Sequence, residues 1–179
     1  LQQRCFELLV DAGVFSPDEP LELHRAGITQ GFSEEALSEA KSINLGVLLE
    51  DPLRADRTAL PAITIDDPET EDRDDALTLE VGERSSSGLR IGIHIADIGA
   101  LVPRGGALDV EADRKMATLY LPERAIGMLP PNFSRRVGSL DPEQQRLAVS
   151  LAVDVTASGE VSGWEAHPSV IRSRAALSY

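Results

Sequence analysis

From residue 60 onward, hydrophobic residues recur at every second position, which is typical of strands with one buried face. Leucine and valine alternate with small or polar residues over 76–81, and leucine and isoleucine do so over 89–95. The polar segment 82–88 between them predicts a turn, so we expect an antiparallel hairpin. A long strand over 147–155, a turn at 157–159 and a returning strand over 161–164 are predicted in the same way.

Before residue 46 the hydrophobic spacing is helical. Cys5, Leu8 and Leu9 lie on one helical face, and Gly13 suits a helix end. The sequence Ser16-Pro17-Asp18-Glu19 has the form of a capping box, and Ser33 is placed to cap a third helix. Three short helices predict a helix-turn-helix-like module, and a helical linker packed on the next domain fits the pattern equally well.

These patterns predict an α+β fold with three parts. A helical N-terminal module spans 1–45, a linker that contains Pro52 spans 46–60, and a larger domain of antiparallel strands with flanking helices, one of them over 108–116, spans 61–179. The chain starts with leucine and ends directly after a strand pattern, so we expect the last domain to be truncated. The lone Cys5 fits a reducing compartment, and no apolar run approaches the roughly 18 residues of a membrane span. These features predict a cytoplasmic protein with no membrane contact.

The net charge of the chain is −13. Nucleic-acid binding usually leaves a basic footprint, so this charge alone argues against an RNA or DNA partner. The alternative is a metal site whose basic substrate channel lies elsewhere. Composition does not choose between these interpretations.

The most informative segment is the acidic run from Asp66 to Asp75, in which seven of ten residues are carboxylates and Arg73 is the one cation. Apolar sequence flanks it on both sides, so we expect the run to be folded against a core. Two charges about 4 Å apart repel by about 1 kcal/mol in water and about 4 kcal/mol at an effective dielectric near 20. A divalent cation would relieve this repulsion, and oxygen ligands select magnesium or manganese.

Within the run, Asp66, Asp72, Asp74 and Asp75 have the spacing D-x5-D-x-D-D. Three hypotheses compete. Four carboxylates from one loop suit one metal ion, or two ions about 3.5–4 Å apart in a phosphodiesterase. A calcium loop of the EF-hand type is discounted because Leu77 stands where that loop needs glycine. A solvated acidic turn is the third, and it is the usual fate of a charge run.

Other residues have simpler interpretations. His94 lies in mid-strand and is expected to be a hydrogen-bonded structural residue, as is Asp97. Trp164 is predicted to be in the core. Arg172 and Arg174 share one strand face and are candidate phosphate contacts.

A series of short motifs also runs in order from about residue 54. They are Arg57-Thr58-Ala59-Leu60-Pro61, Thr64-Ile65-Asp66-Asp67, Asp72-Arg73-Asp74-Asp75-Ala76, His94-Ile95-Ala96-Asp97-Ile98, Tyr120-Leu121-Pro122, Met128-Leu129-Pro130, Ser139-Leu140, Arg146-Leu147-Ala148-Val149-Ser150 and the final stretch from Ile171 to Tyr179. Together they resemble the catalytic RNB domain of the ribonuclease II and ribonuclease R family over about two thirds of the chain. Residues 1–45 do not resemble the paired cold-shock domains that commonly precede this domain.

The resemblance implies a magnesium-dependent hydrolase, with manganese as the alternative ion, that degrades single-stranded RNA processively from the 3′ end to nucleoside 5′-monophosphates. Asp66, Asp72, Asp74 and Asp75 match the four active-site aspartates of the family. By this match Asp66 and Asp75 are direct metal ligands, Asp72 is a ligand or supports one, and Asp74 holds a second metal or the attacking water.

The same resemblance implies RNA contacts. Tyr120 falls where the family has a tyrosine that holds the 3′-terminal nucleotide, and Tyr179 matches a second tyrosine near the RNA channel. The arginine that contacts the scissile phosphate and further stacking aromatics lie beyond Tyr179. An RNA-binding or scaffolding protein with an incomplete RNB domain, and a metal-binding regulatory module with no RNA role, therefore stay as rival hypotheses.

Overall fold

The computed structural model describes residues 2–81, 88–122 and 124–179, and the chain divides into two compact units, Leu1–Phe32 and Ser33–Tyr179. The first unit holds helices α1 (Gln2–Asp11) and α2 (Leu21–Arg25). A cavity of about 540 Å³, lined largely by apolar and aromatic side chains, lies within this unit.

The predicted capping box forms its side-chain bond but does not start a helix. The Glu19 carboxylate accepts a hydrogen bond from the Ser16 amide at 3.4 Å, yet α2 begins only at Leu21. Pro20 explains the difference, because a proline disfavours the helical conformation in the residue before it. The helix end predicted at Gly13 agrees with the structure, where that glycine has a φ of 70° just after α1.

The second unit begins with α3 (Glu34–Ser42), and its predicted cap is confirmed: the Ser33 hydroxyl oxygen accepts from the Ala36 amide at 3.2 Å. Helix α3 is tied to a later helix, since the Glu39 carboxylate accepts from the Ala107 amide at 2.5 Å. The first compact unit therefore ends at Phe32, whereas the sequence pattern placed the end of the helical module at residue 45. The predicted linker contains α4 (Leu45–Leu49) and β1 (Ala55–Asp56).

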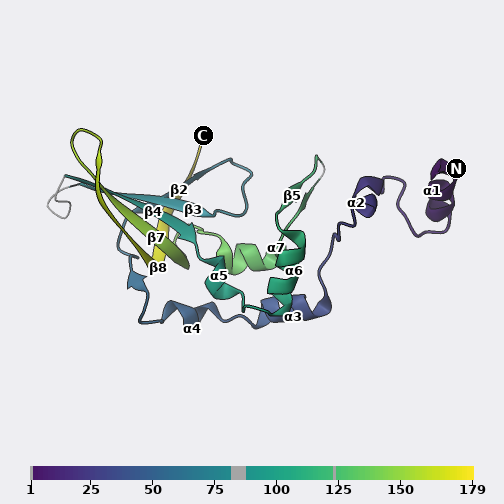
Figure 1. Ribbon diagram of the computed structural model, residues 1–179, viewed down its shortest axis with the longest axis horizontal. Coiled ribbons are helices and arrows are strands. Elements are labelled where there is room, and N and C mark those ends of the chain that lie inside the picture. The colour runs from purple at the N-terminus through teal and green to yellow at the C-terminus, as the bar shows by residue number, and fades with distance from the viewer. Residues whose placement is uncertain (1, 82–87, 123) are drawn as a thin grey trace. The chain divides into compact units, whose positions relative to one another are not determined.

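The rest of the second unit mixes strands and short helices (Figure 1). In chain order these are β2 (Ala62–Asp66), β3 (Asp75–Val81), β4 (Leu89–Ala96), α5 (Ile98–Leu101), α6 (Ala107–Lys115), β5 (Leu119–Tyr120), β6 (Ala125–Ile126), α7 (Pro131–Phe133), the π-helical turn η1 (Ser134–Gly138), β7 (Gln145–Val155) and β8 (Val161–Ser178). The α+β prediction is confirmed. The predicted turn at 82–88 lies, apart from Gly88, outside the described residues.

The main sheet has the strand order β1-β8-β2-β3-β4-β7. Both predicted hairpins are present: β3 pairs antiparallel with β4, and β7 pairs antiparallel with β8. Strand β8 is much longer than the sequence pattern indicated. Its first part pairs with β7 and its last part pairs in parallel with β2, so the pairings of β2, β3, β4, β7 and β8 close into a ring.

The ring determines which face of each strand is buried. In β3 the small residues face inward, so Ala76 is 1% exposed whereas Leu79 is 55% exposed. The inside of this closed sheet is narrow, so the alanine and threonine of β3 fit there together with larger buried residues such as His94 and Ile171. The larger alternating residues lie on the outer surface. Trp164, predicted to be in the core, is 70% exposed for the same reason, and that prediction is wrong.

Helices and the loop after η1 support one end of this sheet. Figure 1 shows α4, α5 and α7 along one side of the strands. Leu140, which follows η1, packs with four buried sheet residues: Ala62, Ala76, Ala148 and Ile171. One member of this cluster, Ala76, directly follows Asp75, the last residue of the acidic run. Among the described residues, no helix has the length and apolar character needed to cross a bilayer.

Candidate functional site

Two neighbouring strands carry the ends of the acidic run. Asp66 is the last residue of β2, and Asp75 is the first residue of β3. The two strands are antiparallel, with Ile63 opposite Leu77. Continuing this register along both strands would set Asp66 opposite Asp74, since successive antiparallel partners move in opposite directions along the chain. The sheet therefore brings Asp66 next to the distal end of the run.

The second half of the run is held by backbone hydrogen bonds. The Arg73 amide donates to the Ser139 hydroxyl at 3.1 Å, and the Leu140 amide donates to the Arg73 carbonyl at 2.9 Å. The Asp74 carbonyl accepts from the Ala96 amide at 2.8 Å. These bonds fix the chain on both sides of Asp74 before it enters β3.

The carboxylates of the run influence one another. Partial burial raises the pKa of Asp74 first, and the charges of Asp75 and Asp66 raise it further. The pKa of Asp72 is also raised, by partial burial and then by the charges of Asp74 and Asp141. Both side chains still reach solvent, so water weakens the repulsion between the neighbouring carboxylates without removing it. A bound cation would favour the charged forms of these groups.

The residues present fit a hard divalent cation in their chemistry. They offer oxygen ligands, and Asp66 Oδ2 is buried without a hydrogen-bond partner among the described residues. An unpaired buried carboxylate oxygen is costly unless a cation or donor reaches it. In the part of the chain that the structure describes, however, no three His, Cys, Asp or Glu side chains are grouped closely enough to hold a metal ion. Metal binding at the four aspartates stays a prediction.

A cavity of about 550 Å³ adjoins the acidic run. Asp72 and Tyr120 both line it, although they are 48 residues apart, and Tyr120 on β5 is 80% exposed. Arg135, the cation among the lining residues, forms an ion pair with Glu71. The remaining lining residues are Asp67, Glu69, Thr70, Thr118, Ala125, Gly127, Met128, Leu129, Pro131 and Ser134. The predicted nucleotide-holding tyrosine thus lines the same cavity as Asp72, whereas Asp66, Asp74 and Asp75 are not among its lining residues.

The other predicted RNA contacts are not among the residues that line this cavity. Arg172 and Arg174 alternate with buried residues on β8 and share an outward face, as predicted. Arg172 lies 3.7 Å from a carboxylate oxygen of Glu143, and Arg174 donates to the Ala59 carbonyl at 3.5 Å. Tyr179 is exposed just after β8. The structure therefore leaves these three residues as predictions separate from the cavity.

Two side chains of the site have partners that the sequence interpretation did not identify. Arg73 Nη1 donates to Asp141 Oδ1 at 3.0 Å, and the Ser139 hydroxyl donates to the same oxygen at 3.0 Å. The pairing of Glu71 with Arg135 is the second such contact. Arg73 stood out in the sequence as the one cation of the run, but no local pattern connects it to a residue 68 positions away.

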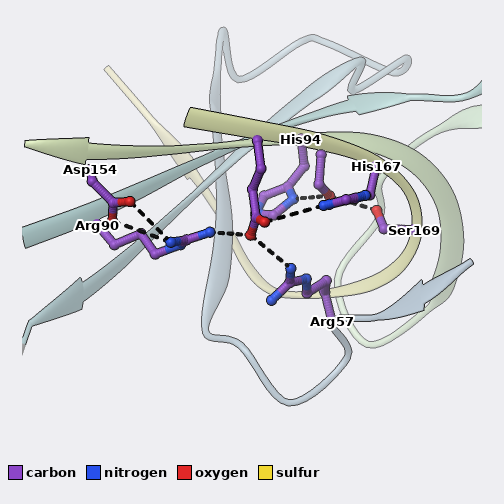
Figure 2. A network of polar contacts seen from close by, with 8 residues as sticks. Arg57, Arg90, His94, Asp154, His167 and Ser169 are labelled. Atoms are coloured by element: carbon purple, nitrogen blue, oxygen red, sulfur yellow. Dashed lines mark hydrogen bonds and ion pairs between the residues drawn. The ribbon is translucent and has the colours of Figure 1, made fainter. Parts of the chain in front are cut away.

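A buried polar chain crosses the inside of the sheet around His94 (Figure 2). His94 is 2% exposed; its Nδ1 lies 2.6 Å from the Ser150 hydroxyl and its Nε2 lies 3.1 Å from the Thr78 hydroxyl. The Ser150 and Ser169 hydroxyls are 2.5 Å apart. Burial, followed by the charge of Arg57, lowers the pKa of His94 to about 4. The prediction of a hydrogen-bonded structural histidine is confirmed.

An ion-pair network lies beside this chain, and Figure 2 shows both together. Arg90 pairs with Asp154 at 3.2 Å and also with Glu165, and Glu165 lies 3.6 Å from Arg57. In register, Arg90 is opposite Glu80, at the end of β3 far from Asp75. The network therefore links strands away from the acidic run.

Asp97 also has the structural role predicted for it. Its carboxylate accepts from the Ala100 amide at 3.2 Å and so caps α5, and it forms an ion pair with Arg54 at 2.8 Å. Both groups of this pair are largely buried, so removing either partner would leave an unpaired charge.

Known proteins resemble most of this chain. The family model described as the RNB domain matches residues 54–179. Ribonuclease R of Thermotoga maritima is 34% identical over 149 residues, which are 83% of this chain and 21% of that protein. A protein of Arabidopsis thaliana named inactive exonuclease DIS3L2 is 40% identical over 126 residues, which are 70% of this chain and 12% of that protein.

A solved structure supports the same relationship. Mycoplasma genitalium RNase R in complex with double-stranded RNA superposes with a TM-score of 0.81 at 25% sequence identity, covering 88% of this chain and 28% of that one. The chain thus covers 21% to 28% of the length of these ribonuclease R relatives.

Proposed function

Because this chain belongs to the RNB-domain family that includes ribonuclease R, we propose that it acts on single-stranded RNA as a 3′-to-5′ exoribonuclease. The products are nucleoside 5′-monophosphates. The observation that carries the proposal is the cavity that Asp72 and Tyr120 line together, beside an acidic run in which the register of β2 and β3 directs Asp66 toward Asp74. A carboxylate and an aromatic side chain in one cavity suit a terminal nucleotide and its scissile phosphate.

In this proposal the four aspartates would hold magnesium, or manganese in its place. Asp66, at the end of β2, and Asp75, at the start of β3, would bind the ion directly, and Asp72 would bind it or support a ligand. Asp74 would orient the attacking water or assist a second ion. The metal would supply charge neutralisation at the phosphoryl group and activation of water.

The aromatic side of the cavity holds the nucleotide. Tyr120 is exposed and available for stacking, which is worth about 1–3 kcal/mol per base and is tolerant of sequence. Met128 and Leu129 form part of the cavity wall next to it. Arg172 and Arg174 contact RNA phosphates, and Tyr179 lies near the RNA channel. Phosphate contacts fix the position of the strand without selecting its sequence.

The full activity depends on more polypeptide than the residues described. The chain spans only a fraction of its ribonuclease R relatives, and the family resemblance implies a phosphate-binding arginine and further aromatics after Tyr179. Basic sequence outside these residues would also offset the net charge of −13. We place the protein in the cytoplasm, with RNA as its partner and no contact with membranes.

The test is an RNA degradation assay on the full-length protein. Single-stranded RNA labelled at its 5′ end is incubated with the protein and magnesium. Stepwise shortening of the labelled strand reports degradation from the 3′ end, and the unlabelled nucleotides that are released are identified as 5′-monophosphates by chromatography. Asp74→Asn is expected to abolish release of monophosphates and to leave RNA affinity largely unchanged, because phosphate and stacking contacts carry the binding. Asp113→Asn on α6 is a matched change outside the site and should retain activity.

A second candidate function is RNA binding without cleavage. It is favoured by the relative named as an inactive exonuclease, which shows that members of this family lose activity. The intact set of four aspartates argues against it here. RNA binding without product would support this candidate, whereas metal binding with neither RNA binding nor cleavage would support a metal-binding regulatory module.

A further inference from the structure

The acidic run is fixed unevenly, and Arg73 is the boundary between its two halves. Before Arg73, the run forms a local turn in which the Thr70 amide donates to the Asp67 carbonyl at 2.9 Å. From Arg73 onward, the main chain is bonded to Ser139, Leu140 and Ala96. The four predicted ligands lie on both sides of this boundary.

The side chain of Arg73 adds an anchor of its own. Its guanidinium pairs with Asp141 at 3.0 Å, and the same carboxylate oxygen accepts the Ser139 hydroxyl that binds the Arg73 amide. Main chain and side chain of Arg73 therefore converge on three consecutive residues, 139–141. Both groups of the ion pair are partly shielded from solvent, so the pair is screened less than a surface pair.

The segment that receives Arg73 is itself rigid. Ser139 and Leu140 are buried, and Leu140 belongs to the hydrophobic cluster to which β2 and β3 also contribute. The buried guanidinium of Arg146 donates to the Ser139 carbonyl at 2.8 Å, from β7. Arg73 is thus connected to the core of the sheet through a segment held from two other directions.

We propose that Arg73 is a positioning residue for the acidic run: its ion pair with Asp141 holds the second half of the run against residues 139–141 and so fixes the aspartates on either side of it for the proposed metal. Asp72 and Asp74 directly flank Arg73 in the sequence, so the bonds that hold Arg73 also hold the backbone that carries both carboxylates. Arg73 also places one positive charge among seven carboxylates, which reduces their repulsion before any cation arrives.

This inference rests on the proposed function only insofar as the run binds a divalent cation, and its test needs no RNA. The affinity for Mn²⁺ is measured by calorimetry in the full-length protein, and hydrogen exchange is measured in a peptide that covers 66–75. Arg73→Met removes the ion pair at similar side-chain length. We expect its Mn²⁺ affinity to fall by about 10-fold, as for groups that orient metal ligands, and exchange in 66–75 to become faster. Arg73→Lys restores one charged donor and should recover part of both.

Arg90→Met is the matched control, because it removes an ion pair of similar burial at the far end of β3. It should leave both Mn²⁺ affinity and exchange in 66–75 at wild-type values, whatever it does to stability. If Arg73→Met does not fold, Asp141→Asn breaks the same ion pair from its other side and carries the test.

The inference is overturned if Arg73→Met binds Mn²⁺ with wild-type affinity, if Arg90→Met weakens binding equally, or if the wild-type protein binds no Mn²⁺. The RNA degradation assay decides the proposed function separately. A wild-type protein that binds Mn²⁺ in an Arg73-dependent manner but degrades no RNA would remove the proposed function and leave this inference standing.

Discussion

Replacing His94 with glutamine tests whether the inside of the sheet holds a neutral histidine. Burial and the charge of Arg57 lower the pKa of His94 from its ordinary value of 6.5 to about 4. Each unit of difference between the folded and unfolded states corresponds to about 1.4 kcal/mol, so the difference amounts to roughly 3 kcal/mol of pH-dependent stability. The glutamine side chain in His94→Gln has no titrating group and can still hydrogen bond to the hydroxyls of Thr78 and Ser150.

The sign follows from the protonation of the two states. Below pH 6.5 the unfolded chain takes up a proton on His94, whereas the folded protein keeps the ring neutral down to about pH 4. The neutral ring therefore contributes its full stability above pH 6.5, loses it as the pH falls from 6.5 to 4, and contributes none below that. The variant His94→Gln lacks this fall. As the pH falls from 6.5 to 4, the free energy of unfolding of the wild type should therefore decrease by roughly 3 kcal/mol relative to that of the variant.

Urea unfolding, followed by far-UV circular dichroism at several pH values from about neutral down to about 4, measures this difference. The raised pKa values of Asp72 and Asp74 increase the stability of the folded protein as the pH falls. Both proteins contain these residues, so this contribution cancels in the comparison. His167→Gln, a change at an exposed histidine, should still lose stability as the pH falls below 6.5, because His94 is present. A constant difference between wild type and His94→Gln across this range would refute the reasoning.

Three further predictions concern the site and the fold. Asp66→Asn and Asp75→Asn should each weaken Mn²⁺ binding in calorimetry, the first because Asp66 Oδ2 is buried and lacks another partner among the described residues; unchanged affinity in both would remove them as ligands. Tyr120→Ala should weaken RNA binding by about 1–3 kcal/mol in fluorescence anisotropy, whereas Tyr120→Phe keeps the stacking ring and should bind normally. Ser33→Ala removes the cap of α3 and should lower the free energy of unfolding by about 1 kcal/mol, with Ser33→Gly losing only a few tenths; equal losses in the two variants would argue against the cap.

The sequence predicted the positions of the strands better than it predicted which face of each strand is buried. The alternation over 76–81 and 89–95 located β3 and β4 within a residue, because a period of two is a local property of the chain. The same alternation did not reveal which face is buried. Ala76 and Thr78 face inward and Leu79 faces outward, because β8 closes the ring and leaves little space inside.

The candidate site also has features that the sequence predicted and features that only the fold revealed. The D-x5-D-x-D-D spacing identified the acidic run, and the order of motifs along the chain identified the family. The cavity that joins Asp72 to Tyr120, and the pairing of Arg73 with Asp141, depend on segments that are distant in sequence. Helix α2 begins at Leu21 and not at the predicted capping box. Pro20 disfavours the helical conformation at Glu19, and this effect outweighs the capping pattern.

Short stretches of neighbouring residues were enough to locate the strands, to show where the carboxylates gather and to identify the family, because each of these is a local property of the chain. Three other features emerged only from the folded molecule: the register of β2 and β3 directs Asp66 toward Asp74, the acidic run is bound to residues 139–141, and Ala76 rather than Leu79 is buried in β3. They could not be anticipated because hydrogen bonding between strands and packing around a closed ring depend on the space that distant segments leave for one another.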